Sequence, residues 1–253
     1  MHRIALLTLF LGAACQRSAE EPELVVYAAA SLRDALQELA PAAEKAAGAH
    51  LVFNFGSSGD LARQILAADA ADLFFSADER ELERVAARLE PDTRAALLSN
   101  QLAVIEPSDA QPSLFHAPFE PAELALVPQL SLADPNAVPA GRYAREWLEA
   151  RGAWEGVASK VVPAVDVRAA LAAVESGALR AGIVYRTDAA RSTRVRVVHL
   201  VPSSEGPRVV YPLAVLAGRP AANRARALAA FLASAEAMET FQRHGFLPLP
   251  RAQ

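Results

Sequence analysis

From residue 24 onward the chain alternates short apolar runs with segments of helical periodicity. Alternation of this kind is typical of βαβ units, in which helices connect parallel strands. The first three strand-like runs cover residues 24–28, 51–55 and 72–76, and helical patterns follow them at residues 32–47, 60–67 and 79–89. The sequence therefore predicts an α/β fold built on a mostly parallel sheet.

The pattern changes after a fourth predicted strand at residues 101–106. Five prolines lie between residues 107 and 128, and no long helix could cross that stretch. Further strands are predicted at residues 130–133, 183–185 and 195–200, helices at 142–151, 167–175 and 223–244, and a returning apolar run at 209–216.

This order predicts two α/β lobes joined by two crossover segments. The first lobe comprises residues 24–106 and 211–253, and the second comprises residues 107–210. The hinge is expected near Glu106 and at residues 209–211. Folds of this kind bind ligands in the cleft at the carboxyl ends of their strands.

Composition excludes several classes of function. The 253 residues are 53% hydrophobic, which is enough for a full core. The net charge is −4 and no basic stripe is present, so no nucleic-acid partner is expected. A single cysteine excludes an internal disulfide, a four-thiolate zinc site and a CxxC redox pair.

That cysteine ends a distinctive N-terminal segment. His2 and Arg3 give a positive start, residues 4–14 are apolar, and Cys15 follows. The segment is too short to span a bilayer but resembles a bacterial lipoprotein signal. In this interpretation residues 1–15 form the signal, Cys15 is lipidated, and residues 16–23 are a tether. The chain is then exported and anchored to a membrane. The alternative is an ordinary cleaved signal with an incidental cysteine.

Four segments place small or hydroxyl residues where a strand or loop runs into a helix: residues 28–32, 56–59, 138–141 and 165–168. The start of a helix has unpaired N–H groups and about half a positive charge. Several such starts directed at one point form an anion site without Arg or Lys.

The motifs around these segments resemble those of the periplasmic molybdate-binding proteins of molybdate ABC importers. The matching stretches are residues 27–32, 55–65, 71–78, 134–143, 165–168 and 182–185, in that order along the chain. Any one of them is weak evidence, whereas the ordered set is specific.

The resemblance implies a type II periplasmic-binding-protein fold whose cleft holds a tetrahedral oxyanion. The residues it implicates are Ser31, Ser58, Ala140, Val167 and Tyr185. The two serines would donate hydroxyl and backbone groups, Ala140 and Val167 their backbone N–H groups, and Tyr185 its phenol. It also implies a monomer that delivers molybdate or tungstate to importer subunits in the membrane, without catalysis, a cofactor or a cation site.

A site made only of neutral donors suits an anion that is fully deprotonated at neutral pH, such as molybdate, tungstate or sulfate. Hydrogen phosphate would leave its proton unpaired, at about 1–3 kcal/mol. Asp60 or Asp166 could supply an acceptor if turned inward, but we expect both to cap backbone N–H groups.

Three alternatives remain open. A binding protein for sulfate or another small oxyanion would keep the fold and change the ligand. The effector lobe of a transcription regulator shares this fold, but the export signal and the lack of DNA-binding helices argue against it. A secreted hydrolase is the third. A Ser-His-Asp triad is not expected, because His50, His116, His199 and His244 have no evident acid partner in the sequence.

Overall fold

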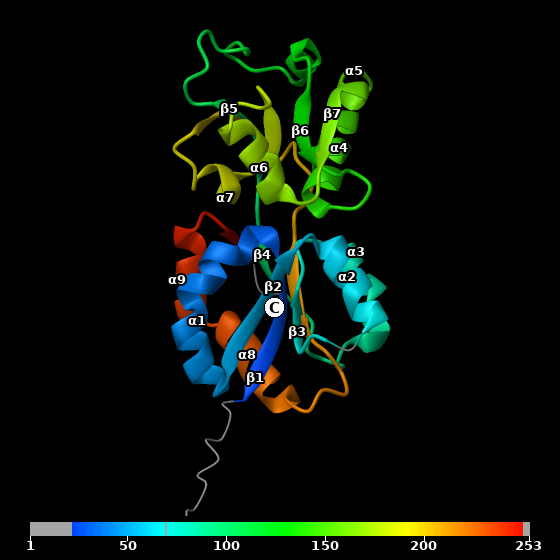
Figure 1. The fold of residues 1–253 in the computed structure, drawn as a ribbon, viewed down its shortest axis with the longest axis vertical. Coiled ribbons are helices and arrows are strands. Elements are labelled where there is room, and N and C mark those ends of the chain that lie inside the picture. The colour runs from blue at the N-terminus through cyan, green and yellow to red at the C-terminus, as the bar shows by residue number, and fades with distance from the viewer. Residues whose placement is uncertain (1–21, 69, 250–253) are drawn as a thin grey trace, which may run out of the picture.

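The alternating pattern produces two sheets, each flanked by helices, which lie one above the other (Figure 1). The computed structural model describes residues 22–68 and 70–249. The predicted signal segment, Cys15 and residues 16–21 of the predicted tether lie outside the described residues. None of the described helices is long and apolar enough to cross a membrane.

Lobe 1 contains a six-stranded sheet with the strand order β11-β4-β10-β3-β1-β2. β1 pairs in parallel with β2 and β3, as expected for strands joined by helices, whereas β10 runs antiparallel to β3 and β4. β3 and β10 are buried along their whole length, which explains their continuous apolar sequence. The strands are β1 (Glu23–Ala29), β2 (His50–Gly56), β3 (Leu73–Phe75), β4 (Ala95–Ser99), β10 (Tyr211–Val215) and β11 (Leu247–Pro248).

Helices cover both faces of this sheet. α1, α8 and α9 pack together on one face, and α2 and α3 lie on the other (Figure 1). α1 follows β1 through a short 3-10 turn and ends at Gly48, whose φ of 61° is in the left-handed region. The helical elements are η1 (Ala30–Leu32), α1 (Arg33–Ala47), α2 (Ser58–Ala67), α3 (Glu79–Arg84), η2 (Ala86–Arg88), α8 (Ala222–Leu232) and α9 (Ala235–Arg243).

Lobe 2 contains a five-stranded sheet with the order β7-β6-β8-β5-β9. β6 pairs in parallel with β7 and β8, and β5 runs antiparallel to β8 and β9. The strands are β5 (Leu102–Pro107), β6 (Leu130–Ala133), β7 (Val161–Ala164), β8 (Gly182–Tyr185) and β9 (Val195–Leu200). The helical elements are η3 (Pro121–Leu126), α4 (Pro139–Ala150), α5 (Trp154–Val157), η4 (Ala158–Lys160), α6 (Val167–Glu175) and α7 (Arg186–Ala189).

The first crossover lies earlier in the chain than predicted. β5 belongs to the lobe 2 sheet, so the chain leaves lobe 1 between Ser99 and Leu102. The predicted crossover at Glu106 was wrong, because Glu106 is fully buried in β5 and its carboxylate pairs with Arg196 at 2.7 Å. The second crossover lies between the end of β9 and Tyr211, the first residue of β10. Both crossover segments connect the lobes in Figure 1.

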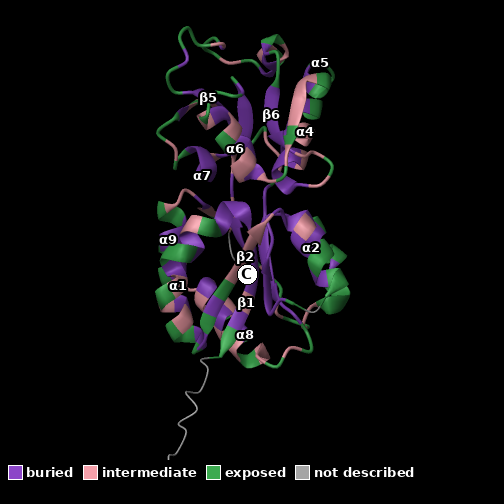
Figure 2. Ribbon diagram, in the orientation of Figure 1, coloured by how far each residue is buried: buried purple, intermediate pink, exposed green. Residues whose placement is uncertain are grey.

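Buried residues are concentrated in the inner strands of both sheets, such as β3, β8 and β10, and in the region where the lobes meet (Figure 2). In that region β1 and β2 of lobe 1 end opposite the starts of α4 and α6 of lobe 2. The strand ends and helix starts predicted to form a site are therefore brought to one place.

Candidate functional site

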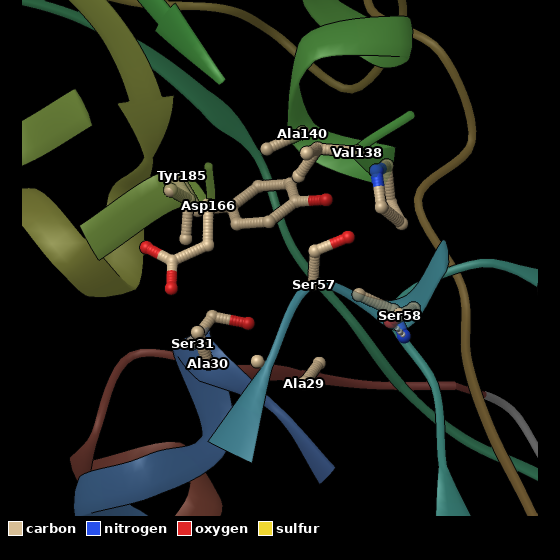
Figure 3. Close-up of a pocket in the computed structure, with 13 residues that line it drawn as sticks. Ala29, Ala30, Ser31, Ser57, Ser58, Val138, Ala140, Asp166 and Tyr185 are labelled. Carbon is tan, nitrogen blue, oxygen red and sulfur yellow. Dashed lines mark hydrogen bonds between the residues drawn. The ribbon is translucent and has the colours of Figure 1, made fainter. Parts of the chain in front are cut away.

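A small pocket lies between the lobes, and Ser31, Ser58, Ala140, Val167 and Tyr185 all line it. The structure thus brings together every residue that the sequence predicted for the site. The cavity is partly open to solvent, and its volume is about 10 Å³, close to that of one water-sized sphere. Sites for drug-sized ligands usually enclose roughly 300–1,000 Å³, so this pocket suits a ligand of only a few heavy atoms. Figure 3 shows the lining residues arriving from both lobes.

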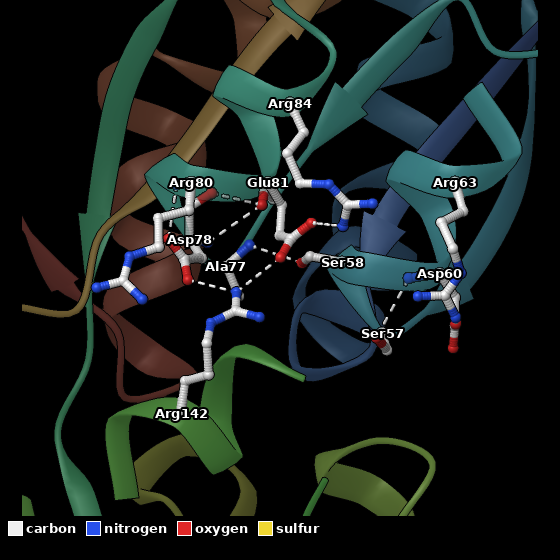
Figure 4. Close-up of polar contacts among 11 residues, drawn as sticks. Ser57, Ser58, Asp60, Arg63, Ala77, Asp78, Arg80, Glu81, Arg84 and Arg142 are labelled. Atoms are coloured by element: carbon white, nitrogen blue, oxygen red, sulfur yellow. Dashed lines mark hydrogen bonds and ion pairs between the residues drawn. The ribbon is translucent and has the colours of Figure 1, made fainter. Parts of the chain in front are cut away.

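Ser58 lies at the first turn of α2, directly after β2. Ser57 precedes it as the N-cap, and its Oγ accepts a hydrogen bond from the Asp60 N–H at 3.4 Å. The Ser58 Oγ accepts a hydrogen bond from the Ala77 N–H at 2.9 Å (Figure 4). Because this oxygen already accepts within the protein, its own proton is available to donate into the pocket.

Ser57 also lines the pocket, and the site prediction did not include it. The paired serines at the end of a strand were the available sequence signal. Only the structure shows that both side chains, the N-cap and the residue after it, border the same space (Figure 3).

Ser31 occupies the 3-10 turn between β1 and α1 and is only 4% exposed. Its Oγ lies 3.0 Å from the hydroxyl oxygen of Tyr211, which begins β10. Ser31 therefore faces the pocket on one side and a buried phenol of its own lobe on the other.

Lobe 2 contributes the first turns of two helices, in which some backbone N–H groups are not capped by a side chain. α4 begins at Pro139, and its N-cap Val138 forms no side-chain cap, so the amides of its first turn face the pocket end of the helix. α6 begins at Val167, and the Asp166 carboxylate accepts from the Ala169 N–H at 2.8 Å. That bond leaves the first N–H of α6, from Val167, uncapped.

Tyr185 supplies the side-chain donor from lobe 2. It ends β8, is 1% exposed, and points its hydroxyl into the space between the labelled residues of Figure 3. That hydroxyl has no hydrogen-bond partner within the described part of the chain. Burial, followed by the nearby Tyr211, raises the pKa of Tyr185 well above its usual value, so the phenol keeps its proton. A buried, protonated and unpartnered hydroxyl indicates a position prepared for an acceptor.

The two carboxylates near the pocket are both engaged elsewhere. Asp166 caps α6, as predicted, and its carboxylate turns away from the Tyr185 hydroxyl (Figure 3). Asp60 was also expected to cap a backbone N–H, which was wrong: Ser57 performs that role, and the Asp60 carboxylate pairs with Arg63 on the surface (Figure 4). No Lys or Arg is among the described residues that line the pocket.

Ion pairs join the lobes on either side of the pocket. On one side Arg142 of α4 contacts Asp78 at 2.6 Å and Glu81 at 2.8 Å (Figure 4). On the other side Arg168 and Arg191 both pair with Asp34 of α1, and Arg168 Nε also lies 2.8 Å from Asp188. All three arginines belong to lobe 2, and they hold the lobes together around the pocket.

The histidines do not form a triad in the described structure, although three of them have carboxylate partners that are not evident from the sequence. His50 pairs with Glu44 at 2.7 Å, and His116 and His244 pair with Glu123 and Glu38. None of these pairs lines the pocket, and His199 stacks on aromatic rings. No group of three or more His, Cys, Asp or Glu residues that could hold a metal ion occurs within residues 22–68 and 70–249.

Comparison with known proteins assigns the family. The sequence profile described as "Bacterial extracellular solute-binding protein" matches residues 24–247. The chain belongs to this family. It is accordingly a solute-binding protein and not an enzyme, which overturns the hydrolase alternative.

Individual relatives of this solute-binding protein cover nearly the whole chain. It is 39% identical to the molybdate-binding protein ModA of Escherichia coli K12, over 95% of this chain and 97% of that protein. It is 35% identical to the ModA of Haemophilus influenzae, with 96% and 95% covered. The periplasmic molybdate-binding protein of Azotobacter vinelandii has the same fold, with a TM-score of 0.78 at 22% identity over 90% of this chain and all of that one.

Proposed function

We propose that this protein captures molybdate in the pocket between its lobes and delivers it to an ABC importer. The observation that carries the proposal is the buried Tyr185 hydroxyl, which is left without a protein partner in the described chain at the point where donors from both lobes converge. The names of the relatives from E. coli and H. influenzae, both molybdate-binding proteins, support the choice of ligand.

In this proposal Ser31 and Ser58 donate their hydroxyl protons to the oxyanion. Ala140 and Val167 donate backbone N–H groups from the starts of α4 and α6, and Tyr185 donates its phenol proton. Hydrogen bonds to a charged acceptor are stronger than neutral ones, which allows neutral donors to hold a dianion. The helix starts add a favourable dipole.

The donors also exclude protonated ligands. The Ser58 hydroxyl already accepts from Ala77, and the Asp166 carboxylate is occupied by Ala169. A ligand proton, such as that of hydrogen phosphate, would therefore find no free carboxylate and would cost about 1–3 kcal/mol. Tungstate has the same shape and charge as molybdate and is expected to bind as well.

Titration calorimetry on protein freed of bound oxyanion tests this function. Molybdate and tungstate should bind with one site per chain, and sulfate and phosphate more weakly. At a free ligand concentration 100 times the Kd, molybdate should stabilise the fold by about 2.7 kcal/mol. Sulfate binding more tightly than molybdate would instead establish the sulfate alternative.

We further propose that the protein works outside the cytoplasm as a lipid-anchored monomer. Residues 4–14 followed by Cys15 provide the signal, and two or more acyl chains suffice for stable anchoring. Metabolic labelling with palmitate should mark the wild type and not Cys15→Ser. Equal labelling of both would contradict the anchor and leave the ligand proposal unaffected.

A further inference from the structure

Three buried polar side chains lie behind Ser31, and none of them lines the pocket. Asn100 lies in the first crossover, Tyr211 follows the second, and Thr187 belongs to α7 of lobe 2. They are 4%, 0% and 2% exposed. Polar groups buried to this degree are normally hydrogen-bonded. Here the contacts also determine which atom of each pair donates and which accepts.

The Asn100 amide fixes that direction. Its Oδ1 accepts from the Gln101 N–H at 2.9 Å, so its Nδ2 faces the two hydroxyls. Nδ2 donates to Thr187 Oγ1 at 2.9 Å and to the Tyr211 hydroxyl oxygen at 3.2 Å. Tyr211 is thus an acceptor toward Asn100.

Tyr211 has one proton left to donate, and Ser31 Oγ lies 3.0 Å away. Burial raises the pKa of Tyr211 above its usual value, so that proton stays on the phenol. When Tyr211 donates to Ser31, the Ser31 proton needs an acceptor other than Tyr211, and the open direction is the pocket.

We infer that Asn100 and Tyr211 are positioning residues that make Ser31 an obligate donor and so determine the selectivity of the pocket for oxyanions without a proton. The inference rests on the proposed oxyanion function. If the ligand offered a proton to Ser31, then either Ser31 or Tyr211 would keep a buried O–H without an acceptor. The pair therefore opposes hydrogen phosphate although it touches no ligand.

Two substitutions test this relay, the series of hydrogen bonds from Asn100 through Tyr211 to Ser31. Tyr211→Phe removes the donor to Ser31 and should weaken molybdate binding about 3- to 10-fold, the usual effect of one hydrogen bond. Asn100→Asp should reverse the direction of these hydrogen bonds. A carboxylate accepts the Tyr211 proton, which leaves the Tyr211 oxygen to accept from Ser31. Ser31 would then offer the ligand only lone pairs.

The measurement is the ratio of the Kd for hydrogen phosphate to the Kd for molybdate, at pH 8. Both ligands are then dianions, so the negative charge that Asn100→Asp adds affects them alike and the ratio reports only the hydrogen-bond direction. We expect the ratio to fall at least about 10-fold in Asn100→Asp and by less in Tyr211→Phe. Thermal unfolding confirms that each variant is folded before its ratio is used.

Tyr27→Phe is the matched control, since Tyr27 is a buried phenol of lobe 1 that does not line the pocket. It should leave the ratio unchanged. If Tyr211→Phe and Asn100→Asp fold and give the same ratio as Tyr27→Phe, the relay is refuted while the molybdate function stands. If the wild type fails to bind molybdate, the proposed function itself is refuted.

Discussion

The two lobes build their halves of the pocket by different means. Lobe 1 contributes side-chain hydroxyls, and each is held by a hydrogen bond within its own lobe: Ser58 by the Ala77 N–H and Ser31 by Tyr211. Lobe 2 contributes the starts of two helices, where backbone groups face the pocket, together with Tyr185. Side-chain identity therefore matters in the lobe 1 half, whereas backbone position matters in most of the lobe 2 half.

The largest effect is expected from a backbone displacement in lobe 2. A Cβ at Gly141 would lie 2.0 Å from the Ala133 carbonyl oxygen and 2.7 Å from its carbon. Gly141→Ala therefore forces α4 away from β6 and moves the Ala140 N–H. Because a hydrogen bond to a charged group contributes about 1.5–3 kcal/mol, and the displaced helix start also loses its favourable dipole position, we expect calorimetry to show a loss of molybdate affinity of about 100-fold or more.

Gly177→Ala is the control for this substitution. Gly177 has a φ of 74° and open space around its missing Cβ. Its replacement should reduce stability by about 1 kcal/mol and leave molybdate affinity unchanged. Wild-type affinity in Gly141→Ala would show that α4 can shift without moving its donors, and would remove the contrast between the lobes.

The second prediction concerns the stability of lobe 2, which should depend on pH. Asp188 is fully buried beside Arg168, and burial raises its pKa from 3.8 to about 6, with the arginine opposing that shift. The folded state thus binds this proton more tightly than the unfolded state. The contribution of this proton to the free energy of unfolding is fully present below about pH 4. It is lost as the pH rises through 6 and amounts to at most about 3 kcal/mol.

The measurement is the free energy of unfolding in urea between pH 4 and pH 8, for the wild type and Asp188→Asn. The difference between the two should change over this range because Asn cannot titrate. Parallel curves would mean that Arg168 keeps Asp188 ionised throughout.

In the lobe 1 half, removal of one hydroxyl should be sufficient to impair binding. Ser58→Ala deletes the donor to the ligand and leaves the Ala77 N–H without its partner. We expect a 10- to 100-fold loss of molybdate affinity, about 1.5–3 kcal/mol for a hydrogen bond to a charged group. Calorimetry measures the affinity and thermal unfolding the accompanying loss of stability.

Ser131→Ala provides the comparison, because Ser131 is a buried serine of β6 whose hydroxyl donates to the Ala170 carbonyl at 2.9 Å. It should reduce stability and leave binding intact. If both serine variants bind alike, the Ser58 hydroxyl is not a ligand.

Much of this architecture was predictable from local sequence. The helix at residues 167–175 and the strands at 130–133 and 195–200 were predicted with their observed bounds, because clear periodicity and an N-cap define them. The strands β4, β7 and β11 were missed, because β4 begins with two alanines and β7 and β11 contain proline, so none has the composition typical of a strand. The strand at 101–106 was assigned to the wrong lobe because sheet membership depends on tertiary pairing.

The site shows the same difference between features set by local sequence and features set by tertiary contacts. Local motifs carry the resemblance to molybdate-binding proteins, so the five residues that the resemblance implies could be named from sequence, and they are found around one pocket. Asn100 and Tyr211 could not be predicted this way. Tyr211 reaches Ser31 from 180 residues along the chain, and no local pattern marks that contact.

The smallest effect is expected where lobe 2 uses only its backbone. Val167→Ala keeps the N–H at the start of α6, so molybdate affinity should change less than about 3-fold even though some buried apolar surface is lost. Val167→Pro removes that N–H. Proline fits the first position of a helix, and Asp166 already has the extended conformation required before proline, with φ −156° and ψ 178°. Calorimetry should therefore show near-normal binding for alanine and a loss of about 10-fold or more for proline. The reverse order would mean that the Val167 side chain, not its amide, contacts the anion.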